Sequence, residues 1–476
     1  MDHGATLYRN TGPARTGRRL MAAPSCASSA SACTYEHMGR NGVATVVALL
    51  TIASCASARD ATVPAYLGDY DLLAADVSLS PDGLGNAVVG RTRLRMRVLR
   101  DGMHELRLDA NALAISSATA NGASIETHVA DDHLVVTLPR SYRRGEQLDL
   151  RFAYAGTPAR GLVLAENVAF TSYFTCDWMI CALDRPGDKA TFTLELSLPA
   201  DWTAFASGTA TPPRDTGARR TWRFNQTAAY SAHLFGFSAG RLNEVRVQHG
   251  IAELVYASAE ASAPDLARMF ADTPGMVDFF ERAAGVPLPH ALYFQAIVQD
   301  ASPQEGAGFA ILPDDAVRPV LENSHEDWAI AHELAHQWWG NSITCATWAD
   351  LWLNEGVTTF MVAAYKQHRW GEADYQREIE LAQRRWAVAR SAGWDRPLAY
   401  AGSYPDLRTR RAVQYSKGML FMVALRRELG EEVFWRALRD YSLRFAGGVV
   451  TSRDFQRSFE RSSHRDLSSL FLQWVY

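Results

Sequence analysis

Apolar and polar positions alternate along the first half of the chain. Over residues 94–98, aliphatic side chains alternate with arginines, and the same period of two recurs over 192–198. Short runs of this kind, separated by turn sequences such as the one at 81–83, are typical of strands with one buried face and one wet face. The pattern predicts an antiparallel β-sandwich domain over residues 60–245.

The period lengthens in the second half, over residues 246–476. Phe434, Leu438 and Tyr441 form an apolar stripe at roughly helical spacing. Apolar runs at Ala291–Val298 and Phe309–Leu312 predict strands just ahead of the main helix. The expected helices are 275–284, 325–340, 355–369, 373–391, 412–429, 431–445 and 465–475. The second domain is therefore expected to be α+β and largely helical.

The first 58 residues differ from both halves. Residues 1–37 are mostly small and polar without periodicity, which predicts a disordered leader. From Met38 onwards, a short basic region precedes an apolar run over 43–53 and then small residues, which is the layout of a secretory signal. A run of about a dozen residues is too short to span a bilayer. We expect a signal peptide over 38–58, which favours Met38 over Met1 as the start of translation.

Two processing routes fit this signal. Ala58 ends a small-x-small cleavage sequence, whereas residues 52–55 resemble a bacterial lipobox in which Cys55 would carry a lipid anchor. Both routes predict export, to the periplasm, to the medium or to a lipid-anchored position on the cell envelope. In an oxidising compartment Cys176 and Cys181 could form a disulfide, although two buried free thiols fit the sequence equally well.

Composition narrows the function classes. A chain of 476 residues predicts two or three domains, and 47% hydrophobic residues exclude a disordered protein. The 48 Lys and Arg residues against 52 Asp and Glu residues give a net charge of −4. This balance offers no basic excess for a phosphate backbone, so no nucleic-acid partner is expected. The oligomeric state, monomer or otherwise, is left open.

The sequence HELAH, from His332 to His336, lies within a helical pattern. Histidines four residues apart project from one face of a helix, so both imidazoles can bind one tetrahedral ion. Glu333 lies about 100° further round the helix. That position suits a base that takes a proton from water on the ion better than it suits a ligand.

A third ligand follows after a loop. Glu355 comes 18 residues beyond the HELAH sequence, at the start of a second predicted helix. Chance would give HExxH with a glutamate at this spacing in on the order of 0.1% of such chains. Three protein ligands with an open fourth position are typical of catalytic zinc. The sequence therefore predicts one Zn²⁺ per chain, held by His332, His336 and Glu355.

These motifs resemble those of the zinc aminopeptidases of the aminopeptidase N and leukotriene-hydrolase family. The resemblance rests on HELAHQWWGN at 332–341, WLNEG at 352–356, LDRPGDKA at 183–190 and VQYSKG at 413–418. It extends over residues 65–476. It implies a thermolysin-like zinc metallopeptidase domain behind the β-sandwich, in a short form without the C-terminal helical domain common in that family.

The resemblance also implies roles. Glu333 would act as the general base and pass its proton to the leaving amine, and Tyr415 would stabilise the oxyanion. The expected activity is hydrolysis of peptides, most simply by removal of N-terminal residues. A zinc endopeptidase and a non-catalytic zinc-bearing binding module are the alternatives.

The residues that would bind the substrate's free amine fit the family pattern less closely. The family uses the glutamate of a Gly-x-Met-Glu-Asn motif, and residues 302–308 give the nearest match. This register places Glu305, Gly306 and Gly308 at the substrate, but Pro303 then lacks an N–H that the family uses.

A second register, over 306–310, would put Phe309 in place of the carboxylate. We favour Glu305. The family's other amine-binding Gln or Glu has no counterpart between residues 167 and 183, although Asp177 could substitute for it.

Overall fold

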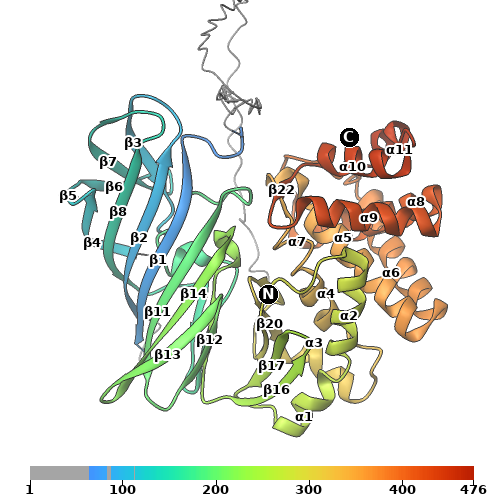
Figure 1. The fold of residues 1–476 in the computed structure, drawn as a ribbon, viewed down its shortest axis with the longest axis horizontal. Helices are drawn as coiled ribbons and strands as arrows, with labels where there is room; N and C mark the ends of the chain where they lie inside the picture. Colours follow the sequence, from blue (N-terminus) through green and yellow to red (C-terminus); the bar gives the residue numbers. More distant parts are fainter. Residues whose placement is uncertain (1–63, 83–86, 112) are drawn as a thin grey trace, which may run out of the picture.

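The computed structural model describes residues 64–82, 87–111 and 113–476. The predicted leader, the signal peptide and Cys55 lie outside these residues. Strands of the N-terminal half form one body, and helices of the C-terminal half gather beside it (Figure 1). Within the described ranges, no helix is both long and apolar enough to cross a membrane.

Three sheets build the N-terminal body. The largest has the order β13-β14-β11-β1-β2-β8-β4-β5, beside sheets of order β3-β7-β6 and β12-β15-β10-β9. Their strands are β1 (Tyr70–Asp82), β2 (Ala87–Val98), β3 (Met103–Leu108), β4 (Leu113–Ala120), β5 (Ala123–Ser124), β6 (Thr127–Ala130), β7 (His133–Tyr142), β8 (Gln147–Gly156), β9 (Leu162–Leu164), β10 (Val168–Thr171), β11 (Lys189–Pro199), β12 (Thr203–Ala206), β13 (Thr209–Thr216), β14 (Arg219–Ser231) and β15 (Phe237–Gly240). One continuous apolar core joins them.

The predicted alternation is confirmed in these strands. In β2 the aliphatic residues at 94, 96 and 98 are fully buried, and the arginines between them face outwards. The expectation of purely antiparallel pairing is wrong at one place. β1 and β11 run parallel, with Val77 opposite Leu194. A parallel pair needs a long crossover connection, which the chain between these strands supplies, and a period of two does not distinguish the two directions.

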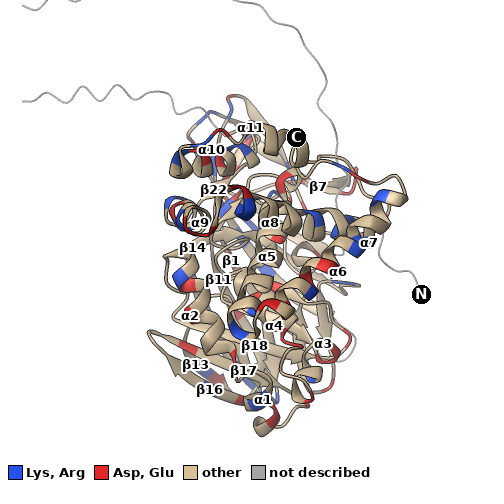
Figure 2. Ribbon diagram, turned by 90° about the vertical axis from the view of Figure 1, so that its right-hand side faces the viewer, with Lys and Arg blue, Asp and Glu red and all other residues tan. Residues whose placement is uncertain are grey.

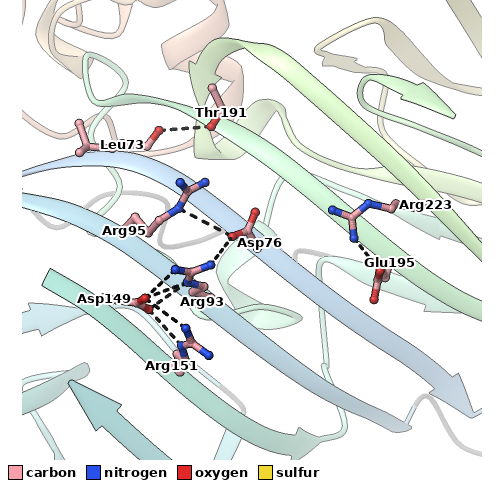
Figure 3. Close-up of polar contacts among 9 residues, drawn as sticks. All are labelled: Leu73, Asp76, Arg93, Arg95, Asp149, Arg151, Thr191, Glu195 and Arg223. Atoms are coloured by element: carbon pink, nitrogen blue, oxygen red, sulfur yellow. Dashed lines mark hydrogen bonds and ion pairs between the residues drawn. The ribbon is translucent and has the colours of Figure 1, made fainter. Parts of the chain in front are cut away.

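Ion pairs cover the outer face of the large sheet (Figure 3). Arg93 contacts Asp149 at 2.6 Å, and Arg223 contacts Glu195 at 2.6 Å. All four side chains are between 27% and 42% exposed. Exposed pairs of this kind contribute about 0–1 kcal/mol each. The sheet is therefore stabilised mainly by the apolar core on its other face.

A separate five-stranded sheet begins the C-terminal half, in the order β16-β17-β18-β20-β19. Its strands are β16 (Asn243–His249), β17 (Ala252–Ser258), β18 (Leu292–Val298), β19 (Gln304–Gly306) and β20 (Phe309–Pro313). The strands expected at 291–298 and 309–312 are β18 and β20. The domain boundary expected between residues 245 and 246 falls inside β16.

Helices make up most of the remainder, and basic and acidic residues are interspersed along them (Figure 2). They are α1 (Ala263–Met269), α2 (Thr273–Ala284), α3 (Asp314–Val317), α4 (Trp328–Ala335), α5 (Trp352–Trp370), α6 (Glu372–Ser391), α7 (Leu407–Arg411), α8 (Gly418–Leu429), α9 (Glu431–Phe445), α10 (Ser452–Ser463) and α11 (Ser468–Trp474), with a π-helix at Ala412–Lys417. Short strands β21 (Thr344–Cys345) and β22 (Val449–Val450) pair with each other.

The helical expectations need correction at the end of one helix and for helices that were not predicted, which are α1, α3, α7 and α10. The helix predicted over 325–340 ends at Ala335, because the chain turns back there and the Asn341 N–H donates to the carbonyl of His336 at 3.0 Å. Helix α10 was not predicted, since only two large apolar residues stand among its polar ones. A capping box formed by Thr451 and Asp454 starts this helix.

Partly buried polar contacts join the two halves. The Lys189 ammonium, on β11, donates to the carbonyls of Asn341, Ser342 and Gly448 at 2.7–3.1 Å. Burial lowers the pKa of Lys189 to about 7. The indole N–H of Trp348 donates to the carbonyl of Asp184 at 3.3 Å. The 183–190 motif thus lies at the junction between the halves.

Helices α5 and α8 cross at a pair of glycines. A Cβ atom on Gly356 would lie 2.7 Å from Cα of Gly418, and one on Gly418 would lie 2.8 Å from Cα of Gly356. Only hydrogen fits on either side of this contact. The crossing fixes the residues beside it, Glu355 on α5 and Tyr415 in the π-helix.

We predict that Gly356→Ala lowers both stability and hydrolytic activity. The added methyl group would push backbone against backbone, and overpacking of this kind costs about 1–3 kcal/mol. Thermal unfolding measures the first effect. Gly275→Ala is the matched control, because this exposed position on α2 has nothing within 4 Å of an added Cβ. A Gly356→Ala protein as stable and active as the control would contradict the prediction.

Candidate active site

The three predicted metal ligands converge. Nε2 of His332 and Nε2 of His336, both from the α4 region, are 3.1 Å apart. Oε2 of Glu355, from α5, lies 3.5 and 3.4 Å from these two atoms. All three side chains are at most 7% exposed. Helix periodicity aligns the histidines, and the return of the chain in α5 brings the carboxylate to them.

Contacts on the other sides of the two histidine rings fix their orientation. Nδ1 of His336 lies 3.0 Å from the carbonyl oxygen of Trp339, so a neutral ring carries its hydrogen there and turns the Nε2 lone pair to the cluster. Thr358 donates to the same carbonyl at 2.8 Å. The ring of His332 stacks on Trp328 and on Tyr415, with centroids 4.4 and 5.8 Å away.

The cluster fits a divalent cation. Among the described residues, no hydrogen-bond partner is found for Oε2 of Glu355, although the atom is buried. Burial alone lowers the pKa of His336, but the negative charges of Glu355, Glu305 and Glu333 raise it to about 10. Three buried carboxylates beside these imidazoles favour a positive charge in the site. Two imidazoles and one carboxylate are a donor set typical of catalytic zinc.

Glu333 lies beside the three predicted metal ligands, His332, His336 and Glu355. It is 3% exposed, and its Oε2 has no hydrogen-bond partner among the described residues. Burial raises the pKa of Glu333 well above its usual range, against the opposing effect of His336. A carboxylate with a raised pKa is better suited to accept and release a proton near neutral pH.

Tyr415 lies in the π-helix, on the other side of the glycine crossing. Burial raises the pKa of its phenol well above 10, and the charges of Glu355 and Glu305 add to this effect. The group therefore stays protonated and can donate a hydrogen bond. Isolated π-turns within helices are frequent at functional sites, and the sequence pattern did not distinguish this one from α-helix.

Glu305 lies on edge strand β19, and it is 6% exposed. Carboxylate oxygens of Glu305 and Glu333 and a ring nitrogen of His336 all lie within 4.8 Å of one another. Phe309, the alternative in the second register, instead packs in the core, with its ring stacked 5.1 Å from that of Phe294. The structure thus places Glu305, and not Phe309, at the cluster.

The predicted glycines shape the turn beside Glu305. The carbonyl of Gly306 accepts from the amides of Gln337 and Asn341 at 3.1 and 2.9 Å, and the Gly308 N–H donates to Gln337 at 3.1 Å. Gly308 has a φ of +82°, which favours glycine. Sequence reasoning assigned no role to Gln337 or Asn341, although both lie within the 332–341 motif.

Asp177 does not lie against Glu305. Its carboxylate is bound by Arg160 and Asn111 within the β domain. The residue of this loop that reaches the cluster is Tyr173, whose hydroxyl oxygen lies 3.0 Å from Oε2 of Glu305. No local sequence signal distinguishes this tyrosine, because the contact joins residues 132 positions apart.

Known proteins share this architecture. Residues 309–474 match the peptidase family M1 domain. Leukotriene A-4 hydrolase of Xenopus laevis is 26% identical over 80% of this chain and 66% of that protein. Aminopeptidase N of Streptomyces lividans is 25% identical over 87% of this chain and 50% of that protein. An M1 zinc metallopeptidase from Deinococcus radiodurans shares the fold, with a TM-score of 0.71 at 24% identity over 86% of this chain and 93% of that one.

The chain thus spans between half and two thirds of the length of these two sequence relatives. The matched segment contains both histidines, Glu333, Glu355 and Tyr415. The resemblance inferred from the motifs is confirmed at the level of this domain. Residues 309–474 are similar to the peptidase family M1 domain, and the site described above lies within this segment apart from Tyr173, Glu305 and the glycines beside Glu305.

Proposed function

We propose that this protein is a zinc-dependent aminopeptidase that removes N-terminal residues from peptides. The observation that carries the proposal is the closeness of Glu305 to the metal ligand His336 and to the base Glu333. Carboxylate oxygens of Glu305 and Glu333 and a His336 nitrogen lie within 4.8 Å of one another. In a peptide, a single Cα separates the terminal ammonium from the first carbonyl. A peptide held by Glu305 therefore presents its first bond to the metal.

Each residue of the site then has its own role in hydrolysis of the peptide bond. Zinc, when bound to the two histidines and Glu355, would acidify water and polarise the scissile carbonyl. Glu333 accepts the proton of the attacking water and delivers it to the leaving amine, a contribution of about 10²–10⁴-fold. Tyr415 donates its O–H to the developing oxyanion, and loss of such a donor costs about 10²–10³-fold in rate.

We also propose that the protein is exported. The apolar run over 43–53, with the small residues behind it, supports a secretory signal. The disulfide between Cys176 and Cys181 supports an oxidising compartment. Processing at Ala58 would release the protein, and lipidation of Cys55 would tether it to the envelope.

Blocking the substrate's amine should abolish turnover. A peptide with a free N-terminus should lose single residues from that end, as followed by mass spectrometry. The same peptide with an acetylated N-terminus should be stable, because the amide cannot bind Glu305 as an ammonium. Internal cleavage of both peptides at equal rates would instead identify an endopeptidase.

Glu333→Gln should abolish turnover while retaining the metal. The amide keeps the shape of the side chain but cannot take a proton, so kcat should fall by about 10²–10⁴-fold. The measurements are steady-state kinetics and the zinc content of the purified variant. Glu380→Gln, at an exposed position on α6 that is 64% exposed, is the control. Normal turnover in Glu333→Gln would refute its role as the base.

Removal of the ion should be reversible. We expect about one zinc per chain, loss of activity on dialysis against a chelator, and recovery on addition of one equivalent of Zn²⁺. Glu355→Gln should weaken zinc retention, because it removes the only charged ligand. Activity that persists in metal-free protein would contradict the proposed chemistry.

A further inference from the structure

One side chain of the β domain reaches the proposed amine site. Tyr173 follows β10, and its hydroxyl oxygen lies 2.7 Å from the carbonyl oxygen of Pro303 and 3.0 Å from Oε2 of Glu305. Its side chain is partly accessible, whereas that of Glu305 is buried. The two oxygens thus lie side by side, and they come from different halves of the molecule.

The hydroxyl has only one hydrogen for these two acceptors. A hydroxyl group donates once and accepts through two lone pairs. If it donates to Pro303 over the shorter distance, the phenol oxygen and the Glu305 carboxylate face each other as two acceptors. A donor between them would satisfy both. An ammonium group has three N–H donors and a positive charge that the carboxylate favours.

We propose that Tyr173 binds the substrate's α-ammonium together with Glu305, with its oxygen accepting one N–H while its own O–H donates to Pro303. This inference rests on the proposed aminopeptidase function and extends it. It makes the β domain a direct part of substrate recognition. The residue that was expected to assist Glu305, Asp177, is bound to Arg160 instead.

The loop that carries Tyr173 is fixed in place. The Ser172 N–H donates to the carbonyl of Gly161 at 2.9 Å. The guanidinium of Arg160 lies 4.0 Å from the centre of the Phe174 ring, and the disulfide of Cys176 with Cys181 closes the next turn. A loop with these restraints holds the phenol oxygen in position before substrate arrives, which reduces the entropy lost on binding.

The phenol also keeps the protonation state that this role requires. Burial raises the pKa of Tyr173 well above 10, and the charges of Glu305 and Glu333 raise it further. A neutral phenol retains the O–H that Pro303 accepts. The neighbouring carboxylate alone then balances the charge of the ammonium.

Tyr173→Phe tests the inference because it removes one oxygen atom and leaves the ring. The probes are L-phenylalaninol, which has a free amine and no scissile bond, and its N-acetyl derivative. Binding of both to the zinc-loaded protein is measured by titration calorimetry. We expect Tyr173→Phe to bind phenylalaninol about 10-fold more weakly, as for loss of a hydrogen bond to a charged group, with no change for the acetylated probe.

Kinetics give a second readout. For a peptide with a free N-terminus, Tyr173→Phe should raise KM about 10-fold and change kcat less, at unchanged zinc content. Tyr142→Phe is the matched control. This tyrosine also lies in the β domain, where its hydroxyl bonds to Asn121.

The outcomes separate the two claims. Wild-type protein that prefers the free amine, together with a Tyr173→Phe variant that binds both probes like the control, would overturn the role of Tyr173 alone. Wild-type protein with no preference for the free amine would overturn the aminopeptidase proposal and this inference together. An equal loss for both probes would show that Tyr173 supports the fold and not the ammonium.

Discussion

Burial of three carboxylates in one small volume is the constraint on which this structure depends. Glu305, Glu333 and Glu355 are each at most 6% exposed, and they share a neighbourhood with two imidazoles. Charges removed from water are costly unless opposite charge compensates them. A divalent cation at the histidines and a substrate ammonium at Glu305 would supply that compensation. Helices α4 and α5, edge strand β19 and the loop that carries Tyr173 hold the three carboxylates in position. There they can bind both the metal ion and the ammonium.

The parts of the site that the sequence predicts are those fixed by local geometry. Four-residue spacing on a helix determines the relation of His332 to His336, whatever the rest of the fold. Glu355 needed only one further assumption, a second helix returning beside the first. The register of Glu305 needed tertiary information, because only the packing of Phe309 in the core distinguishes the two alternatives.

Hydrophobic periodicity did not predict three other features. The parallel pairing of β1 with β11 follows from chain topology. A hydrophobic period of two does not distinguish parallel from antiparallel strands. Helix α10 is stabilised by its capping box and by two phenylalanines, too few to make a periodic pattern. Tyr173 gains its position from a contact between two domains. The strand pairing and the Tyr173 contact depend on residues far apart in the sequence, which periodicity does not relate to each other.

Side chains of the β domain contact the elements that build the site. Lys189 binds three carbonyls in and near the turn after α4, and Tyr173 contacts Glu305. The domain interface therefore extends to the proposed substrate site. A change in how the two halves pack would alter the position of the phenol oxygen as well as stability.

Zinc K-edge absorption spectroscopy of the zinc-loaded protein tests the central claim most directly. The account predicts a shell of nitrogen and oxygen atoms only, at about 2.0–2.2 Å, including two imidazoles. In Glu355→Gln, the oxygen that the carboxylate contributes to the zinc shell should be lost. A zinc–sulfur distance near 2.3 Å, which would place the ion on a thiol such as that of buried Cys345, would contradict the account. So would a shell without histidine.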